Sequence, residues 1–434
     1  MISPIILLCV FILVYAVCSI RKLSVELSLL ISAIVTGLAG GLAGMFSPLE
    51  LPRHLVEGTF TYLDIVLIFV TGATFMAILQ AAGAIDYIVY YIVSSTGRWR
   101  PLTLVLLAIL LLIPGALTGA GSISLLVMGA PVATALASLG ISGERIAAIL
   151  FILGGLSAAA PPVNVWAMIT CAGTAIPYVG FELTLAIPVV ALAIFTVLFL
   201  GWKKSATSFQ LVNSLPRPTQ NVRWWQIVLP FVTFFSLVIS ERLWPFSMPV
   251  FGLPLVFAVS AFVGWICFFK TIRIWSLSLG VVQRLLPLLA TVVVVGVVQQ
   301  ILTATGIRGL IAYAILALPV IAIYAVLPAI IPFSEGVLTY GGAAVLGIPL
   351  AWFFDSIGQH ATVVIAGLSL LWLLGDGLPP TALIGRLSML TSGYKGRYAQ
   401  MLRASLVPWI LITVVALAMI IFSRKFAFLV AWST

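Results

Sequence analysis

A set of glycine and proline residues occurs twice in this chain at one fixed spacing. Pro114, Gly129, Pro131, Gly140 and Pro161 each have a residue of the same type 218 positions later. A constant long period indicates that a structural unit has been duplicated. Each copy interrupts apolar sequence, which predicts broken segments rather than plain helices. The partners are Pro332, Gly347, Pro349, Gly358 and Pro379.

Composition places this duplicated unit in a membrane. Only 7% of the 434 residues are charged and 63% are hydrophobic, whereas soluble domains carry about 25% charged residues. Apolar runs long enough for helical spans of roughly 20 residues recur along the chain, which favours helices over a barrel. Residues 2–20 lack a preceding basic region and a cleavage site, so we expect a retained span rather than a signal peptide.

Both halves have the same predicted order of spans, a broken hairpin, an interrupted helix and a last span. We expect a first repeat at residues 1–201, a linker at 202–225 and a second repeat at 226–434. Interfacial segments are predicted at 47–58 and 270–284. Uninterrupted spans are predicted at 2–20, 23–46, 59–82, 180–200, 226–240, 250–269, 285–304 and 405–423. Hairpins are predicted at 101–139 and 318–354, with interrupted helices from 142 onward and over 360–390.

The distribution of basic residues predicts how the halves are oriented. The loop at 202–225 contains Lys203, Lys204, Arg217 and Arg223, so the positive-inside bias places it in the cytoplasm. This bias also explains the net charge of +10, because the basic residues are dispersed and do not form a nucleic-acid-binding patch. Counting gives five crossings per half, which makes the halves oppositely oriented. The predicted fold class is an all-α polytopic membrane protein with two inverted-topology repeats, each about five spans plus a re-entrant hairpin and an interrupted helix.

The two breaks in each half supply the candidate binding groups. Exposed helix N-termini suit anions, and unwound carbonyls with Ser, Thr and Asn oxygens suit a cation such as sodium. The alternative is that the small residues only permit close helix packing, but their symmetric placement favours a site. The candidate substrate-binding and sodium-binding residues are Thr118, Gly119, Gly121, Ser122, Ser124, Pro161, Pro162, Asn164, Ser334, Glu335, Thr339, Gly341, Gly342, Gly375, Asp376, Pro379, Pro380 and Thr381.

Three acids lie at or near membrane depth in the second half. An ionisable residue inside a membrane is a functional candidate by default. Glu335 and Asp376 fall in the two breaks and could bind a cation or take up a proton. The alternative is a structural ion pair with an arginine such as Arg308 or Arg386. For Asp355 a loop position and a functional role remain equally open.

Several other function classes lack their sequence signatures. The chain contains no His-Glu-x-x-His or Gly-x-Gly-Asp motif, which argues against an intramembrane metalloprotease or aspartyl protease. It contains no Gly-x-x-x-x-Gly-Lys-Ser/Thr motif for ATP. A channel would not need two interrupted helices. The four cysteines form no Cys-x-x-Cys pair, so neither a disulfide framework nor a zinc site is indicated.

Three motifs give the chain a family resemblance. Leu117-Thr-Gly-Ala-Gly-Ser122, Ala160-Pro-Pro-Val-Asn-Val165 and Leu378-Pro-Pro-Thr-Ala-Leu-Ile-Gly385 resemble the large membrane subunit of TRAP-type (tripartite ATP-independent periplasmic) transporters. That subunit belongs to the ion-transporter superfamily, whose members share two inverted halves. The resemblance covers nearly the whole chain in length and order. Asp376 departs from the pattern, because it places an acid in the second break.

The resemblance implies a function, partners and a location. It implies a permease, not an enzyme, that moves a small organic anion such as a dicarboxylate or sugar acid by an elevator-type alternating-access mechanism. Sodium would be the coupling ion, and no other cofactor is expected. A small membrane subunit and an extracytoplasmic substrate-binding protein would be partners in the inner (plasma) membrane. The alternative is a stand-alone sodium- or proton-coupled carboxylate carrier, and an intramembrane enzyme is the remote alternative.

Overall fold

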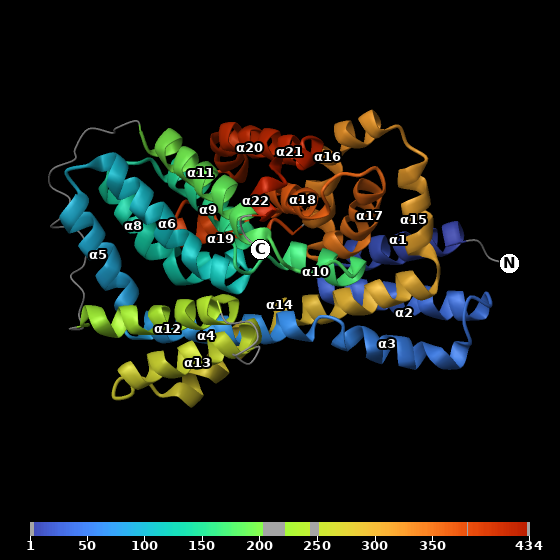
Figure 1. The fold of residues 1–434 in the computed structure, drawn as a ribbon, viewed down its shortest axis with the longest axis horizontal. Helices are drawn as coiled ribbons and strands as arrows, with labels where there is room; N and C mark the ends of the chain where they lie inside the picture. Colours follow the sequence, from blue (N-terminus) through green and yellow to red (C-terminus); the bar gives the residue numbers. More distant parts are fainter. Residues whose placement is uncertain (1–3, 203–221, 244–250, 380, 432–434) are drawn as a thin grey trace.

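The computed structural model describes residues 4–202, 222–243, 251–379 and 381–431, and the regular elements within them are helices. Figure 1 shows two groups of helices, a lower row and an upper body. The predicted all-α, polytopic fold class is confirmed. The linker predicted at 202–225 falls mostly outside the described residues, so the proposed domain boundaries stay predictions.

The lower row, called the scaffold layer here, contains the first helices of both halves. Its longest member, α14, packs against α2, α3 and α4, and α13 packs against α4 and α12. Gly58 and Gly296 permit a close crossing, since a Cβ at Gly296 would lie 2.3 Å from the Gly58 carbonyl oxygen. The scaffold layer comprises α1 (Pro4–Ile20), α2 (Val25–Leu42), η1 (Pro48–Glu50), α3 (Leu51–Phe60), α4 (Leu63–Ala81), α12 (Trp224–Leu243), α13 (Gly252–Cys267) and α14 (Ile274–Ala304).

The upper body, called the hairpin layer here, contains both broken hairpins and both interrupted helices. Its central helices α9 and α18 are apolar on all sides, which suits a fully buried helix. In the first half it comprises α6 (Arg100–Thr118), α7 (Gly121–Ser124), η2 (Leu125–Gly129), α8 (Ala130–Ser138), α9 (Gly143–Ala159), α10 (Val165–Thr174) and α11 (Phe181–Gly201). In the second half it comprises α16 (Val320–Leu338), η3 (Ala343–Gly347), α17 (Ile348–Ser356), α18 (Ala361–Gly375), α19 (Leu383–Ser392), α20 (Tyr398–Ile421), α21 (Ser423–Phe426) and α22 (Phe428–Ala431).

The duplication is visible in the backbone as well as in the sequence. The π-helical turns η2 and η3 occupy residues 125–129 and 343–347, and α8 and α17 follow each at once. Connecting helices α5 (Ala84–Thr96) and α15 (Ile307–Leu316) each begin after a left-handed glycine, Gly83 or Gly306. In Figure 1, α5 and α15 lie at opposite ends of the long axis. Equivalent elements at opposite ends are the arrangement expected of inverted repeats.

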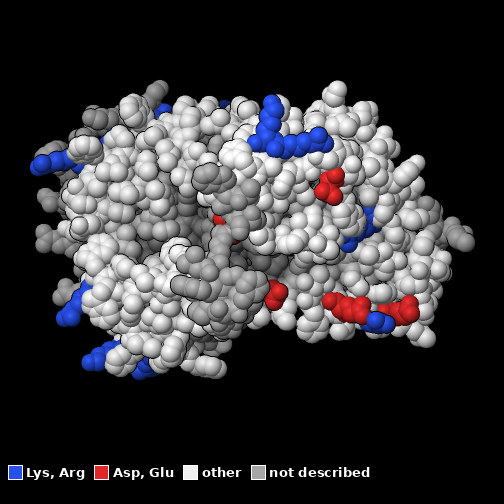
Figure 2. All heavy atoms as spheres, viewed as in Figure 1, with Lys and Arg blue, Asp and Glu red and all other residues white. Residues whose placement is uncertain are grey.

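The surface has the character of a membrane protein. Within the described residues, eight helices are long and apolar enough to cross a membrane. Large apolar side chains are exposed along them, for example Leu38, Phe199 and Val414. Figure 2 shows a face largely without charge, with several Lys and Arg at the left end, where Figure 1 places α5, α12 and α13, and a few charged side chains at the upper middle and over the right half. A surface with so few charges and so many exposed apolar side chains is typical of contact with lipid.

One of the two interfacial segments predicted within the scaffold layer is wrong. Residues 270–284 do not form a separate interfacial segment, because α14 runs without a break from Ile274 to Ala304. At 31 residues it is about 46 Å long, so its first turns extend beyond a hydrocarbon core of about 30 Å. Residues 47–58 form η1 and most of α3, a short helix separate from α4 that packs on α14, so the interfacial position predicted for them stays a prediction.

Candidate functional site

The first interrupted helix is closed by its own hydrogen bonds. Asn164 caps α10, because its Oδ1 accepts from the Ala167 N–H at 2.9 Å. Its Nδ2 donates to the Ala159 carbonyl oxygen at 3.1 Å, and its Oδ1 also accepts from the Ser369 hydroxyl at 3.3 Å. The Tyr178 hydroxyl accepts from the Asn164 N–H and donates to the Pro162 carbonyl oxygen, both at 3.0 Å.

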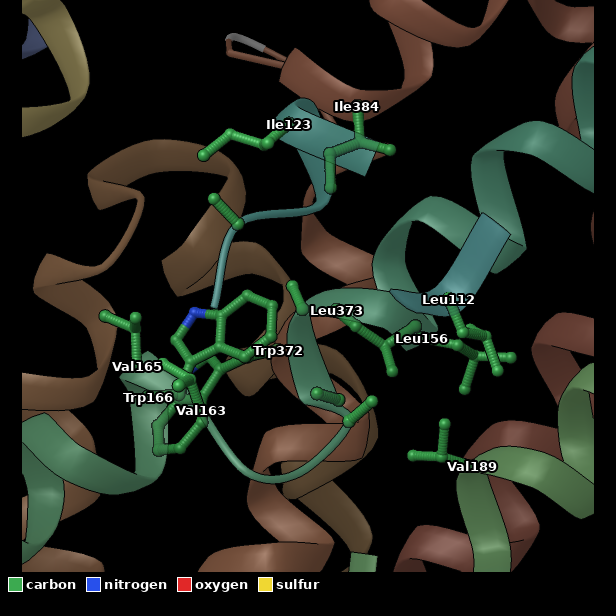
Figure 3. Packing of buried hydrophobic residues seen from close by; sticks show 14 of the residues in the cluster. Leu112, Ile123, Leu156, Val163, Val165, Trp166, Val189, Trp372, Leu373 and Ile384 are labelled. Atoms are coloured by element: carbon green, nitrogen blue, oxygen red, sulfur yellow. The ribbon is translucent and has the colours of Figure 1, made fainter. Parts of the chain in front are cut away.

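The tip of the first hairpin is also held by hydrogen bonds within the protein. The left-handed Gly119 ends α6, and the Ser124 hydroxyl accepts from the Gly115 N–H at 2.6 Å. The Val163 N–H donates to the Ala116 carbonyl oxygen at 3.1 Å, which joins hairpin and break. Figure 3 shows apolar packing around this break. The labelled side chains include Val163, Val165 and Trp166 from the break and α10, with Trp372 and Leu373 from α18.

The second interrupted helix has a different character. α18 ends at Gly375, α19 begins at Leu383, and the acid Asp376 follows α18 directly. Asp376 is 7% exposed, and Glu335 of the second hairpin is 1% exposed. The two carboxyl groups are close enough to interact electrostatically. The Glu335 Oε2 atom is buried and has no hydrogen-bond partner.

Two aromatic residues connect this acid pair to the first half. Tyr340 interacts electrostatically with both carboxyl groups, and its hydroxyl donates to the Gly119 carbonyl oxygen at 3.2 Å. The Trp166 ring lies 5.7 Å from the Tyr340 ring, and Trp166 also adjoins Glu335. The tips of the two hairpins therefore meet at the acid pair.

A cavity of about 850 Å³ lies between the scaffold layer and these broken elements. Glu335 and Asp376 line it from the second half, and Gly121 and Ser122 line it from the first hairpin. Basic residues Lys22, Arg284 and Arg386 line it from α1–α2, α14 and α19. The cavity thus combines two buried carboxyl groups with basic side chains at other positions of its wall.

The structure separates the predicted site residues into those that line the cavity and those that do not. Gly121, Ser122, Glu335, Thr339, Asp376 and Thr381 line it. Thr118, Gly119, Ser124, Pro161, Pro162, Asn164, Ser334, Gly341, Gly342, Gly375 and Pro379 are not among its lining residues. Pro380 lies outside the described residues. Asp355 is exposed near the end of α17 and is also absent from the lining.

Several lining residues were missed as site candidates. They are Tyr15, Lys22, Glu26, Arg284, Thr291, Tyr340 and Arg386. Arg386 was considered only as a structural ion-pair partner of an acid, and Lys22 and Arg284 were not site candidates. The signal that could have found Tyr340 and Arg386 is their position, close to the second hairpin break and the second interrupted helix. No such signal marks the residues from α1, α2 and α14, because only the fold brings them to the cavity.

The fold is shared with a solved membrane transporter. The YdaH transporter of Alcanivorax borkumensis, described as having an unusual topology, superimposes with a TM-score of 0.58 at 12% sequence identity. The match covers 88% of this chain and 89% of the transporter. No protein-family model and no curated protein sequence matches the chain. The chain is therefore a polytopic helical membrane protein with a transporter fold.

Proposed function

We propose that the chain is a secondary active transporter that moves a small organic anion through the cavity between the scaffold layer and the hairpin layer. The observation that carries this proposal is the wall of that cavity, to which both repeats contribute and in which Lys22, Arg284 and Arg386 supply positive charge. Guanidinium and ammonium groups bind carboxylates through charge-assisted hydrogen bonds. A site shared between inverted repeats is typical of alternating-access carriers.

The mechanism we propose is an elevator. The hairpin layer carries the bound substrate past the scaffold layer, while α5 and α15 act as connecting arms. In Figure 1 each arm lies at one end of the molecule and links a scaffold helix to a hairpin. A cation gradient drives the cycle, with sodium expected from the TRAP-type resemblance and a proton as the alternative.

The proposed partners follow from the same resemblance. A small membrane subunit and an extracytoplasmic substrate-binding protein would complete a tripartite transporter in the inner membrane. The second candidate function is a stand-alone carboxylate carrier, favoured by the cavity, which is formed from this chain alone.

The test is uptake of labelled succinate into proteoliposomes that contain the purified chain. Uptake under an ion gradient without any partner supports the stand-alone carrier, and uptake only with a binding protein supports the tripartite one. We expect Arg284→Gln to raise KM about tenfold with little change in maximal rate, because it removes binding charge from the wall. Lys270→Gln, a basic residue outside this cavity, is the matched control. Absence of gradient-driven uptake of succinate and of other small organic anions contradicts the proposed substrate class.

A further inference from the structure

The buried acid pair has no basic partner. In the described part of the chain, no ion pair links Glu335 or Asp376 to a lysine, arginine or histidine. A buried carboxylate without a partner is costly, and two adjacent ones also repel each other. Binding of a proton or of a metal cation lowers both costs. The atoms around the two carboxyl groups determine which cation binds there.

The carbonyl oxygens at the start of the second break accept hydrogen bonds from the protein itself. Residues 374–378 form the end of α18 and the turn that follows it, and every one of their carbonyl oxygens accepts a hydrogen bond, at 2.7–3.2 Å. The Gly336 carbonyl oxygen accepts from both the N–H and the hydroxyl of Thr381. A sodium site in a broken helix is built from unwound carbonyl oxygens. Here those oxygens stabilise the break, whereas the Glu335 Oε2 atom has no partner.

We infer that the Glu335–Asp376 pair is the site of the coupling proton, so a proton gradient rather than sodium drives this chain. A proton needs only one carboxyl oxygen, such as the unpartnered Glu335 Oε2, and protonation of one of two interacting carboxyl groups avoids two charges at one place. Because the pair lines the cavity, a proton can enter from the side to which the cavity opens. This inference rests on the proposed transport function for its role, but proton binding itself can be measured without a substrate.

The groups that face the pair fit this role. Tyr340 and Tyr398 are close enough to interact electrostatically with Asp376, and Arg386 interacts with Tyr398. α18 contains no ionisable side chain, Cys171 lies in a later turn of α10, and the acid and base of α9, Glu144 and Arg145, lie in its first turn. Across the cavity the ionisable residues are Tyr15, Lys22, Glu26 and Arg284.

The first test is infrared difference spectroscopy of the full chain in lipid nanodiscs during a pH titration. We expect a carboxylic-acid band to appear on acidification. Glu335→Gln and Asp376→Asn should each remove the equivalent of about one titrating acid per chain. Asp355 is an exposed acid of the same half, so Asp355→Asn is the matched control. This variant should leave the carboxylic-acid band of Glu335 and Asp376 at full intensity. An identical band in the wild type and both pair variants overturns the inference, provided both variants elute as the wild type does.

The second test separates sodium from protons. At constant pH, exchange of choline for sodium should leave the band unchanged. Loss of the band on sodium addition means that sodium displaces the proton, and the inference is then wrong.

The third test connects the site to transport. With equal sodium on both sides, an inward proton gradient should drive accumulation of labelled succinate. Each pair variant should lose accumulation at least tenfold and keep exchange of succinate at equal pH. Succinate uptake driven by sodium at equal pH leaves the proposed function intact and overturns the proton assignment. A titrating pair with no succinate movement under either gradient leaves the proton site supported and shows the substrate to be wrong.

Discussion

The two interrupted helices occupy equivalent places in the repeats but differ in the residues that surround their breaks. The first break is closed by Asn164, Tyr178 and apolar side chains, and none of its predicted residues lines the cavity. The second break contains Asp376, faces Glu335 and lines the cavity directly. We conclude that the first break is chiefly structural and the second carries the proposed ion chemistry. Mutations in the first break should therefore lower stability, and mutations in the second break should impair transport.

The largest loss of stability is expected for Asn164→Ala. It removes a helix cap, for which about 0.5–2 kcal/mol is typical, and leaves buried groups unpaired at about 1–3 kcal/mol. We expect a loss of roughly 2–4 kcal/mol, seen as a lower apparent Tm in detergent. Ser369→Ala, which removes only one partner of Asn164, is the control and should cost about 1 kcal/mol. An unchanged Tm for Asn164→Ala would contradict a structural role for the first break.

A smaller loss is expected for Gly375→Ala in the second break. An added Cβ would lie 2.3 Å from the Pro332 carbonyl oxygen and 2.5 Å from the Glu335 Cβ. Backbone has to move, at a cost of about 1–3 kcal/mol, and the acid pair moves with it. Gly341→Ala is the matched control, because its nearest neighbour would be 3.3 Å away. Equal Tm values for the two variants would show that the hairpin and α18 are not in tight contact.

The sequence predicted the architecture of these two breaks but not the difference between them. The repeated Gly and Pro residues placed both hairpins and both interruptions correctly, because these residues restrict backbone wherever they occur. Whether a break is closed depends on side chains that fold back onto it, such as Tyr178. Glu335 and Asp376 could be identified from the sequence because an acid within an apolar, membrane-spanning segment is a functional candidate. Lys22 and Arg284 reach the cavity only through tertiary packing, so no local pattern marks them.

The contact between the two hairpin tips should have a modest effect. Tyr340→Phe removes the hydrogen bond to the Gly119 carbonyl oxygen and keeps the ring against Trp166. We expect a loss of about 1 kcal/mol, the usual net value of one hydrogen bond, together with faster hydrogen exchange at residues 116–122. Tyr313→Phe, an exposed tyrosine of α15, is the control. Unaltered exchange at the first tip would mean that the tips are held together by packing alone.

The smallest effect on stability is expected where the effect on transport is largest. Asp376→Asn replaces a buried acid by a neutral group of the same size, and removing a buried charge is often neutral or stabilising. We expect an apparent free energy of unfolding within about 1 kcal/mol of the wild type, while proton-driven accumulation is lost. A Tm that falls as far as that of Asn164→Ala would mean that both breaks are structural. The different roles of the two breaks, and the proton site, therefore require that Asn164→Ala lowers the Tm and that Asp376→Asn abolishes proton-driven accumulation at nearly unchanged Tm.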